Sequence, residues 1–155
     1  MIPKRTLRET IELFDEYKND LPMEEYNRLL REKVMSLEHR YTIELDKLLN
    51  DFREYYSNVK GVRIKKAEVV NKAIERISVE EIIKAIEVKE VKLKNEIRDS
   101  VKISLINCKK ILKVQDKNEI SRNNLINFLT LKYFRENSFE KILKEIDNEN
   151  SKNEQ

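Results

Sequence analysis

The sequence predicts a mainly α-helical fold with two short strands, and three observations lead to this class. The 155 residues include one Gly and two Pro, too few turn residues for a sandwich, a barrel or a Gly-rich phosphate loop. Charged and hydrophobic residues each make up 39% of the chain, which suits several amphipathic helices that share a core. Apolar side chains recur at steps of three and four through most of the chain. One small domain, or two very small units, is expected.

Residues 1–38 are expected to form a helical extension. A first helix over 4–20 has an apolar face made by Leu7, Ile11, Phe14 and Tyr17. A second helix over 22–37 has Pro22 in its first turn. Its apolar stripe consists of Tyr26, Leu29, Leu30, Val34 and Leu37.

The hydrophobic period changes to two in residues 39–45, which predicts a short strand with two different faces. The apolar face consists of Tyr41, Ile43 and Leu45, and the polar face of Arg40, Thr42 and Glu44. A helix is expected from Asp46 to Val59, and Gly61 provides its left-handed stop. A further helix follows over 65–77.

Ser78 and Glu81 match a capping box, which predicts the start of a long charged helix that runs to about Arg98. The same order of elements then recurs about 60 residues later. Residues 101–105 alternate as 41–45 do, a helix over 107–117 follows, and the segment Ile120–Asn127 matches Ile64–Asn71 at an offset of 56. Residues 138–146 match 78–86 at an offset of 60. We interpret this as an internal duplication.

A strand followed by two helices resembles the ribbon-helix-helix superfamily of DNA-binding proteins, the Arc, MetJ and CopG group. The segment RYTIELDKLLNDFREYYSNVKGVRIKKAEVVNKAI and, less closely, residues 100–136 carry the resemblance. Two such units in one chain are similar to the tandem arrangement of the conjugation protein TraY. The predicted units are 39–78 and 100–137, with a linker helix at 79–99, a C-terminal helix at 138–147 and a disordered tail at 148–155.

The resemblance implies that the two strands form an antiparallel ribbon on the helical core and that its outward side chains read bases in the DNA major groove. The expected base-reading residues are Arg40, Thr42, Glu44, Lys102 and Ser104, with Ser100 a marginal addition. The family also holds a phosphate at the start of the second helix. The residues at these starts are Lys65, Lys66, Ser121 and Arg122.

The charge distribution agrees with this expectation. Residues 39–78 have a formal charge of +3 and residues 100–138 of +5. Residues 1–38, 79–99 and 139–155 contribute −2, −1 and −2, so the net +3 hides a basic pair of units. Concentrated positive charge is typical of phosphate binding.

Other classes of function are disfavoured. One Cys and one His leave no set of residues for a disulfide framework or a zinc site, and no cofactor or catalytic constellation is expected. His39 is expected to contact solvent or phosphate. Neither a signal peptide nor a membrane span is recognisable, so a cytoplasmic protein without membrane contact is expected.

The sequence therefore predicts a non-enzymatic, sequence-specific binder of double-stranded DNA, either a transcriptional regulator or a plasmid or phage accessory factor in transfer or partition. The alternative is an all-helical protein-interaction module, antitoxin-like or a phage inhibitor, favoured by the acidic N-terminal helices. These helices suit packing on the ribbon core or a contact between copies of the chain. Whether the two strands pair within one chain or between chains stays open.

Overall fold

The computed structural model describes residues 6–16, 18, 20–88 and 97–153. These ranges are mainly helical, as predicted, with one two-stranded antiparallel sheet. In chain order the elements are α1 (Leu7–Glu16), α2 (Met23–Glu32), β1 (Val34–Tyr41), α3 (Ile43–Lys60), α4 (Lys66–Glu75), α5 (Val79–Val88), β2 (Ile97–Ser104), α6 (Leu105–Lys117), α7 (Arg122–Glu136) and α8 (Phe139–Asn153).

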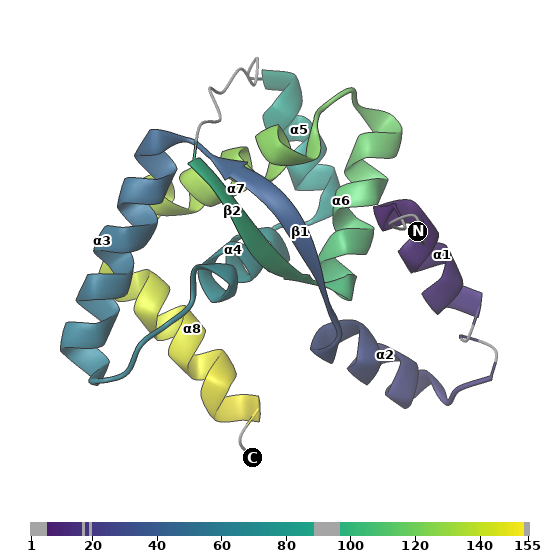
Figure 1. Ribbon diagram of the computed structural model, residues 1–155, viewed down its shortest axis with the longest axis horizontal. Coiled ribbons are helices and arrows are strands. Elements are labelled where there is room, and N and C mark those ends of the chain that lie inside the picture. The colour runs from purple at the N-terminus through teal and green to yellow at the C-terminus, as the bar shows by residue number, and fades with distance from the viewer. Residues whose placement is uncertain (1–5, 17, 19, 89–96, 154–155) are drawn as a thin grey trace.

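The two strands pair with each other within the one chain. The register runs from Val34 opposite Ser104 to Tyr41 opposite Ile97, with Glu38 opposite Ser100 near the middle. Figure 1 shows the two strands crossing in front of the helices, which cover one face of the sheet and leave the other open. The covered face buries Leu37, His39, Tyr41, Val101 and Ile103. A two-stranded sheet is marginal alone, so this burial is what holds it in place.

The order strand, helix, helix, helix occurs twice. We refer to β1, α3, α4 and α5 as unit 1 (Val34–Val88) and to β2, α6, α7 and α8 as unit 2 (Ile97–Asn153). The two middle helices, α4 and α7, pack together behind the strands. The last helix of each unit packs on the first helix of the other, α5 on α6 and α8 on α3. The two units therefore interlock and share one core.

The helix starts carry the repeat most clearly, because polar residues cap most of them. Thr42 and Ser104 cap α3 and α6 at an offset of 62, and their hydroxyls accept bonds from Leu45 N and Asn107 N. Lys65 and Ser121 stand at the starts of α4 and α7 at an offset of 56. Ser78 and Ser138 cap α5 and α8 at an offset of 60. The predicted capping at Ser78 is confirmed, as is Gly61, which ends α3 at φ 73.

The first strand lies earlier in the chain than predicted. It occupies Val34–Tyr41 instead of 39–45, so the predicted second helix ends at Glu32. The alternation of Tyr41, Ile43 and Leu45 continues by coincidence across the start of α3, where Ile43 is 59% exposed. Because Thr42 caps α3, the chain turns from strand to helix at that residue. The strand offset is accordingly 62 and not 60.

Three other predicted boundaries change. Ile97 and Arg98 belong to β2 and not to the linker helix, whose predicted residues 89–96 lie outside the described ones. The predicted disordered tail is wrong from 148 to 153, where α8 continues. The predicted first helix over 4–20 contracts to Leu7–Glu16, and its Tyr17 is also outside the described residues.

The N-terminal helices pack on unit 2. Both α1 and α2 contact α6, beside which they lie in Figure 1. Lys109 of α6 donates to Asp15 Oδ1 at 3.0 Å and to the Tyr26 hydroxyl at 2.8 Å, and the Tyr26 hydroxyl donates to the same carboxylate. Burial tends to raise the pKa of Asp15, yet hydrogen bonds from Tyr26 and Lys109 lower it below its usual value. This cluster fastens the extension to the core.

We predict that Phe52→Ala lowers the free energy of unfolding by about 3–5 kcal/mol. Phe52 is fully buried on α3, and its ring centroid lies 6.0 Å from that of Phe134 and 5.5 Å from that of Phe139, so it joins α3 to α7 and α8. Urea unfolding measures the loss. Val59→Ala, at a side chain that is 55% exposed on the same helix, is the control and should cost less than about 0.5 kcal/mol. Equal losses for both variants would contradict the assigned core.

Candidate nucleic-acid interface

The uncovered face of the sheet carries a row of exposed polar side chains. We call it the outer face; every second residue from Ser36 to Arg40 and from Arg98 to Lys102 contributes to it. Across the strands, Ser36 is paired with Lys102, Glu38 with Ser100 and Arg40 with Arg98. Three of the six side chains are cationic and one is acidic. The acidic one, Glu38, has its Oε2 atom 3.8 Å from Nη2 of Arg98. The outer face consists of Ser36, Glu38, Arg40, Arg98, Ser100 and Lys102.

The outer face repeats the symmetry of the two units. At the offset of 62 set by the caps, Glu38 corresponds to Ser100, and these two residues are also opposite each other in the ribbon. The midpoint of the repeat therefore coincides with the midpoint of the strand pair. Arg40 corresponds to Lys102 in the same way. The backbone is thus arranged symmetrically, while the side chains of the two halves differ.

Such a surface has the shape and chemistry for the major groove of DNA. A two-stranded ribbon is narrow enough to enter that groove. Guanidinium and ammonium groups donate to the guanine O6 and N7 acceptors, and Ser hydroxyls donate or accept. The six side chains are exposed and alternate along both strands with buried ones.

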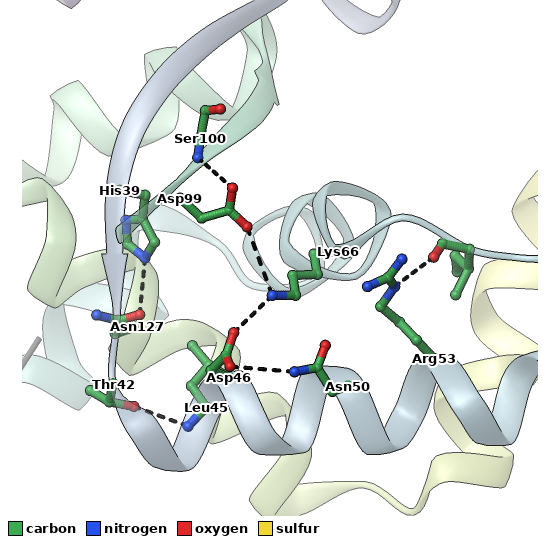
Figure 2. Close-up of polar contacts among 11 residues, drawn as sticks. His39, Thr42, Leu45, Asp46, Asn50, Arg53, Lys66, Asp99, Ser100 and Asn127 are labelled. Atoms are coloured by element: carbon green, nitrogen blue, oxygen red, sulfur yellow. Dashed lines mark hydrogen bonds and ion pairs between the residues drawn. The ribbon is translucent and has the colours of Figure 1, made fainter. Parts of the chain in front are cut away.

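Two of the predicted base-reading residues, Arg40 and Lys102, lie on the outer face. Thr42 and Ser104 do not, because they are buried and their hydroxyls cap α3 and α6 (Figure 2 shows Thr42 bonded to Leu45). Glu44 lies in the first turn of α3 and pairs with Arg135 at 3.2 Å. The structure therefore places Thr42 and Glu44 outside the strand, whereas Ser104 is the last residue of β2 but is buried as the cap of α6.

The prediction missed four members of the outer face: Ser36, Glu38, Arg98 and, as a full member, Ser100. A signal was present in the sequence, since Met35, Leu37, His39 and Tyr41 alternate with Ser36, Glu38 and Arg40. Val34 and Leu37 also continue a helical spacing from Leu30, and Tyr41 also begins the alternation into 45. Because of these two competing patterns, the strand was predicted later in the chain than it lies.

The predicted phosphate-binding residues lie at the starts of α4 and α7, but the two starts differ. Lys65 is exposed, whereas Lys66 is 18% exposed and is bound by two carboxylates, Asp46 at 2.7 Å and Asp99 at 3.8 Å (Figure 2). The Lys66 ammonium also lies 5.4 Å from the centre of the Tyr41 ring. Its charge is therefore already neutralised within the chain.

At the start of α7, by contrast, the cationic side chain is not bound by a described carboxylate. Ser121 is exposed and caps Asn124 N, and Arg122 donates to the carbonyl of Glu38 at 3.2 Å. In the described part of the chain no carboxylate pairs with Arg122. Arg122 thus lies beside the middle of β1 without an ion pair to a described carboxylate, which favours an anion there more than at Lys66.

His39 and Cys108 are both buried beneath the ribbon. His39, predicted to meet solvent or phosphate, is 1% exposed and donates through Nε2 to Asn127 Oδ1 at 3.0 Å (Figure 2). Burial lowers the pKa of His39 below its ordinary value, and the nearby charge of Arg122 acts in the same direction. Burial raises the pKa of the Cys108 thiol to about 12. Neither group is placed for chemistry on a ligand.

Within the described ranges, no group of three or more His, Cys, Asp or Glu side chains is arranged to hold a metal ion. Nor does any described helix combine the length and apolar character needed to cross a bilayer. Comparison with protein-family models, with curated proteins and with solved structures found no match.

We predict that Thr42→Ala lowers the free energy of unfolding by about 1 kcal/mol, because α3 loses the oxygen that caps Leu45 N. Thr42→Ser should restore most of it. Thermal or urea unfolding of the three proteins provides the measurement. A Thr42→Ala protein with unchanged stability and altered DNA sequence preference would contradict the capping role.

We predict that His39 makes the fold less stable as the pH falls below about 6.5, the ordinary pKa of this side chain. The unfolded chain binds a proton there, while buried His39 stays neutral until its lower pKa is reached, so unfolding becomes more favourable. The loss is about 1.4 kcal/mol for each pH unit between the two pKa values.

The measurement is urea unfolding from pH 7.5 to 5.5, in wild type and in His39→Gln, whose amide can still donate to Asn127. Carboxylates titrate alike in both proteins, so the difference isolates the sole His of the chain. Identical pH profiles would contradict the prediction.

Proposed function

We propose that this chain is a tandem ribbon-helix-helix protein that binds double-stranded DNA sequence-specifically, with the outer face in the major groove. It acts as a transcriptional regulator or as a plasmid or phage accessory factor in transfer or partition. The observation that carries the proposal is the outer face itself. Six polar side chains, three of them cationic, are exposed on a two-stranded ribbon whose other face buries Leu37, His39, Tyr41, Val101 and Ile103.

The side chains of the outer face read the bases. Arg40, Arg98 and Lys102 donate to guanine, and the hydroxyls of Ser36 and Ser100 donate or accept. Glu38 suits the exocyclic amine of cytosine. Because the two halves of the outer face differ in side chains, the preferred site is not palindromic.

Phosphate contacts position the ribbon on the duplex. The start of α7, with Ser121 and Arg122, supplies one such contact, and Lys65 at the start of α4 supplies the other. Since Lys66 is already paired with Asp46 and Asp99, unit 1 holds its phosphate less strongly than unit 2.

We predict that Arg40→Ala and Lys102→Ala each remove about 1–3 kcal/mol of discrimination between the preferred duplex and a duplex with one changed base pair. The duplex is obtained by selection from a random-sequence pool, with the DNA around the chain's own gene as a second source. Fluorescence anisotropy at several salt concentrations measures both affinities.

Arg28→Ala is the matched control, because Arg28 is an exposed Arg on α2 that pairs with Glu25 and Glu32 away from the ribbon. It should leave discrimination unchanged. Undiminished sequence preference in the Arg40→Ala Lys102→Ala double variant overturns the proposed reading face. Affinity that does not fall with salt overturns DNA binding itself.

A protein-interaction module is the second candidate, favoured by the exposed carboxylates of α1 and α2. Five of them, Glu9, Glu12, Glu16, Glu24 and Glu25, are exposed on helices that pack on unit 2 and leave the outer face exposed. Recovery of a protein partner and no DNA from a pull-down, with binding lost on neutralising these carboxylates, would favour it.

A further inference from the structure

Two Asn side chains occupy equivalent places in the two units and reach across to the opposite unit. Asn71 on α4 and Asn127 on α7 are 56 residues apart, the same offset as the starts of their helices. Each lies behind the ribbon, and each bonds to the strand of the other unit. An exchanged contact of this kind, made twice, ties both strands to the central pair of helices.

Asn71 holds the end of β2 through both atoms of its amide. Its Nδ2 donates to the carbonyl of Lys102 at 2.9 Å, and its Oδ1 accepts from Ser104 N at 3.0 Å. Asn107 of α6 donates to both Asn71 Oδ1 and the Asn71 carbonyl, each at 3.0 Å. The Asn71 side chain is therefore held from unit 2 and also by its own helix, where its Nδ2 donates to the Ala67 carbonyl at 2.8 Å.

Asn127 holds the end of β1 in the same manner. Its Nδ2 donates to the carbonyl of Arg40 at 2.8 Å, and its Oδ1 accepts from His39 Nε2 at 3.0 Å (Figure 2). The Arg40 backbone N–H also donates to Asn123 of α7, at 3.4 Å. Asn127 is fully buried, so these bonds are shielded from water.

The two carbonyls that receive these bonds belong to the corresponding residues Arg40 and Lys102, which are cationic and exposed on the outer face. A fixed peptide fixes the direction in which the side chain leaves the strand, and bidentate base contacts depend on that direction. Small misplacement at such a position reduces discrimination more than overall attraction to the duplex.

We propose that Asn71 and Asn127 are positioning residues for base reading, each aligning the recognition side chain of the opposite unit: Asn71 aligns Lys102, and Asn127 aligns Arg40. This proposal rests on the proposed DNA-binding function and deepens it. Under this proposal, a change in the helix of one unit alters base reading by the other unit: a change in α4 of unit 1 affects the bases read by unit 2. If each helix positioned the strand of its own unit instead, a change in α4 would affect the bases read by unit 1.

The test is a set of double-mutant cycles on DNA discrimination, using the selected duplex and its single base-pair variants as probes. Asn71→Asp keeps the acceptor for Ser104 N–H and removes the donor to the Lys102 carbonyl. Discrimination should fall about tenfold at the base pairs read by Lys102. The change should have no further effect in a Lys102→Ala background and its full effect in an Arg40→Ala background.

Asn127→Ser should give the reverse pattern, with its effect lost in the Arg40→Ala background. Asn71→Ala, which adds no charge, should reproduce Asn71→Asp. Thr130→Ala is the structural control, because Thr130 is buried on α7 and its hydroxyl bonds only within its helix in the described structure. It should lower the melting temperature and leave the discrimination ratio unchanged.

Asn variants that lower discrimination equally in both backgrounds, or that lower stability alone as Thr130→Ala does, overturn the positioning role while leaving DNA binding intact. Arg40→Ala and Lys102→Ala proteins that discriminate as well as wild type overturn the proposed function first, and the positioning role with it. The single variants therefore separate the two failures before any Asn residue is changed.

Discussion

The antiparallel pairing of β1 with β2 is the interaction on which the rest of the structure depends. Neither strand has another partner in the described sheet. Helices pack on the buried face of both strands. The pairing brings Leu37 and Tyr41 of unit 1 beside Val101 and Ile103 of unit 2, so one core is built from both. It also aligns two rows of polar side chains on the opposite face. Stability and the outer face thus follow from one register, since a slip by one residue would exchange buried and exposed side chains.

The duplication produces a symmetric scaffold with asymmetric chemistry. Strand positions, helix starts and the crossed Asn contacts correspond between the units. Lys66, however, forms ion pairs with Asp46 and Asp99, while its counterpart Arg122 forms none with a described carboxylate and donates to the carbonyl of Glu38. The N-terminal helices cover α6 without an equivalent on α3 among the described residues. A single chain holding both halves can differentiate them in this way, which two identical chains cannot.

The sequence predicted the helical class, the capping at Ser78 and the stop at Gly61, because these features depend on residues that are close together in the sequence. It misplaced the first strand because Thr42 is compatible with both a strand and a helix cap, and Val34 and Leu37 also fit a helical stripe. Tertiary pairing with β2 decides between these patterns, and no local period contains that information. For the same reason, the sequence did not predict that Ser36, Glu38 and Arg98 lie on the outer face or that His39 is buried.

Site-directed photocrosslinking tests the central claim most directly. The one Cys of the chain, Cys108, is buried with its thiol pKa raised to about 12, so a Cys introduced at the exposed Ser100 is selectively labelled. A photoactivatable probe there lies at the centre of the outer face, and Glu24→Cys on α2 provides the matched site away from it. Crosslinks to bases of the selected duplex are expected from Ser100→Cys and none from Glu24→Cys. Crosslinks to DNA from Glu24→Cys, with none from Ser100→Cys, would contradict the claim.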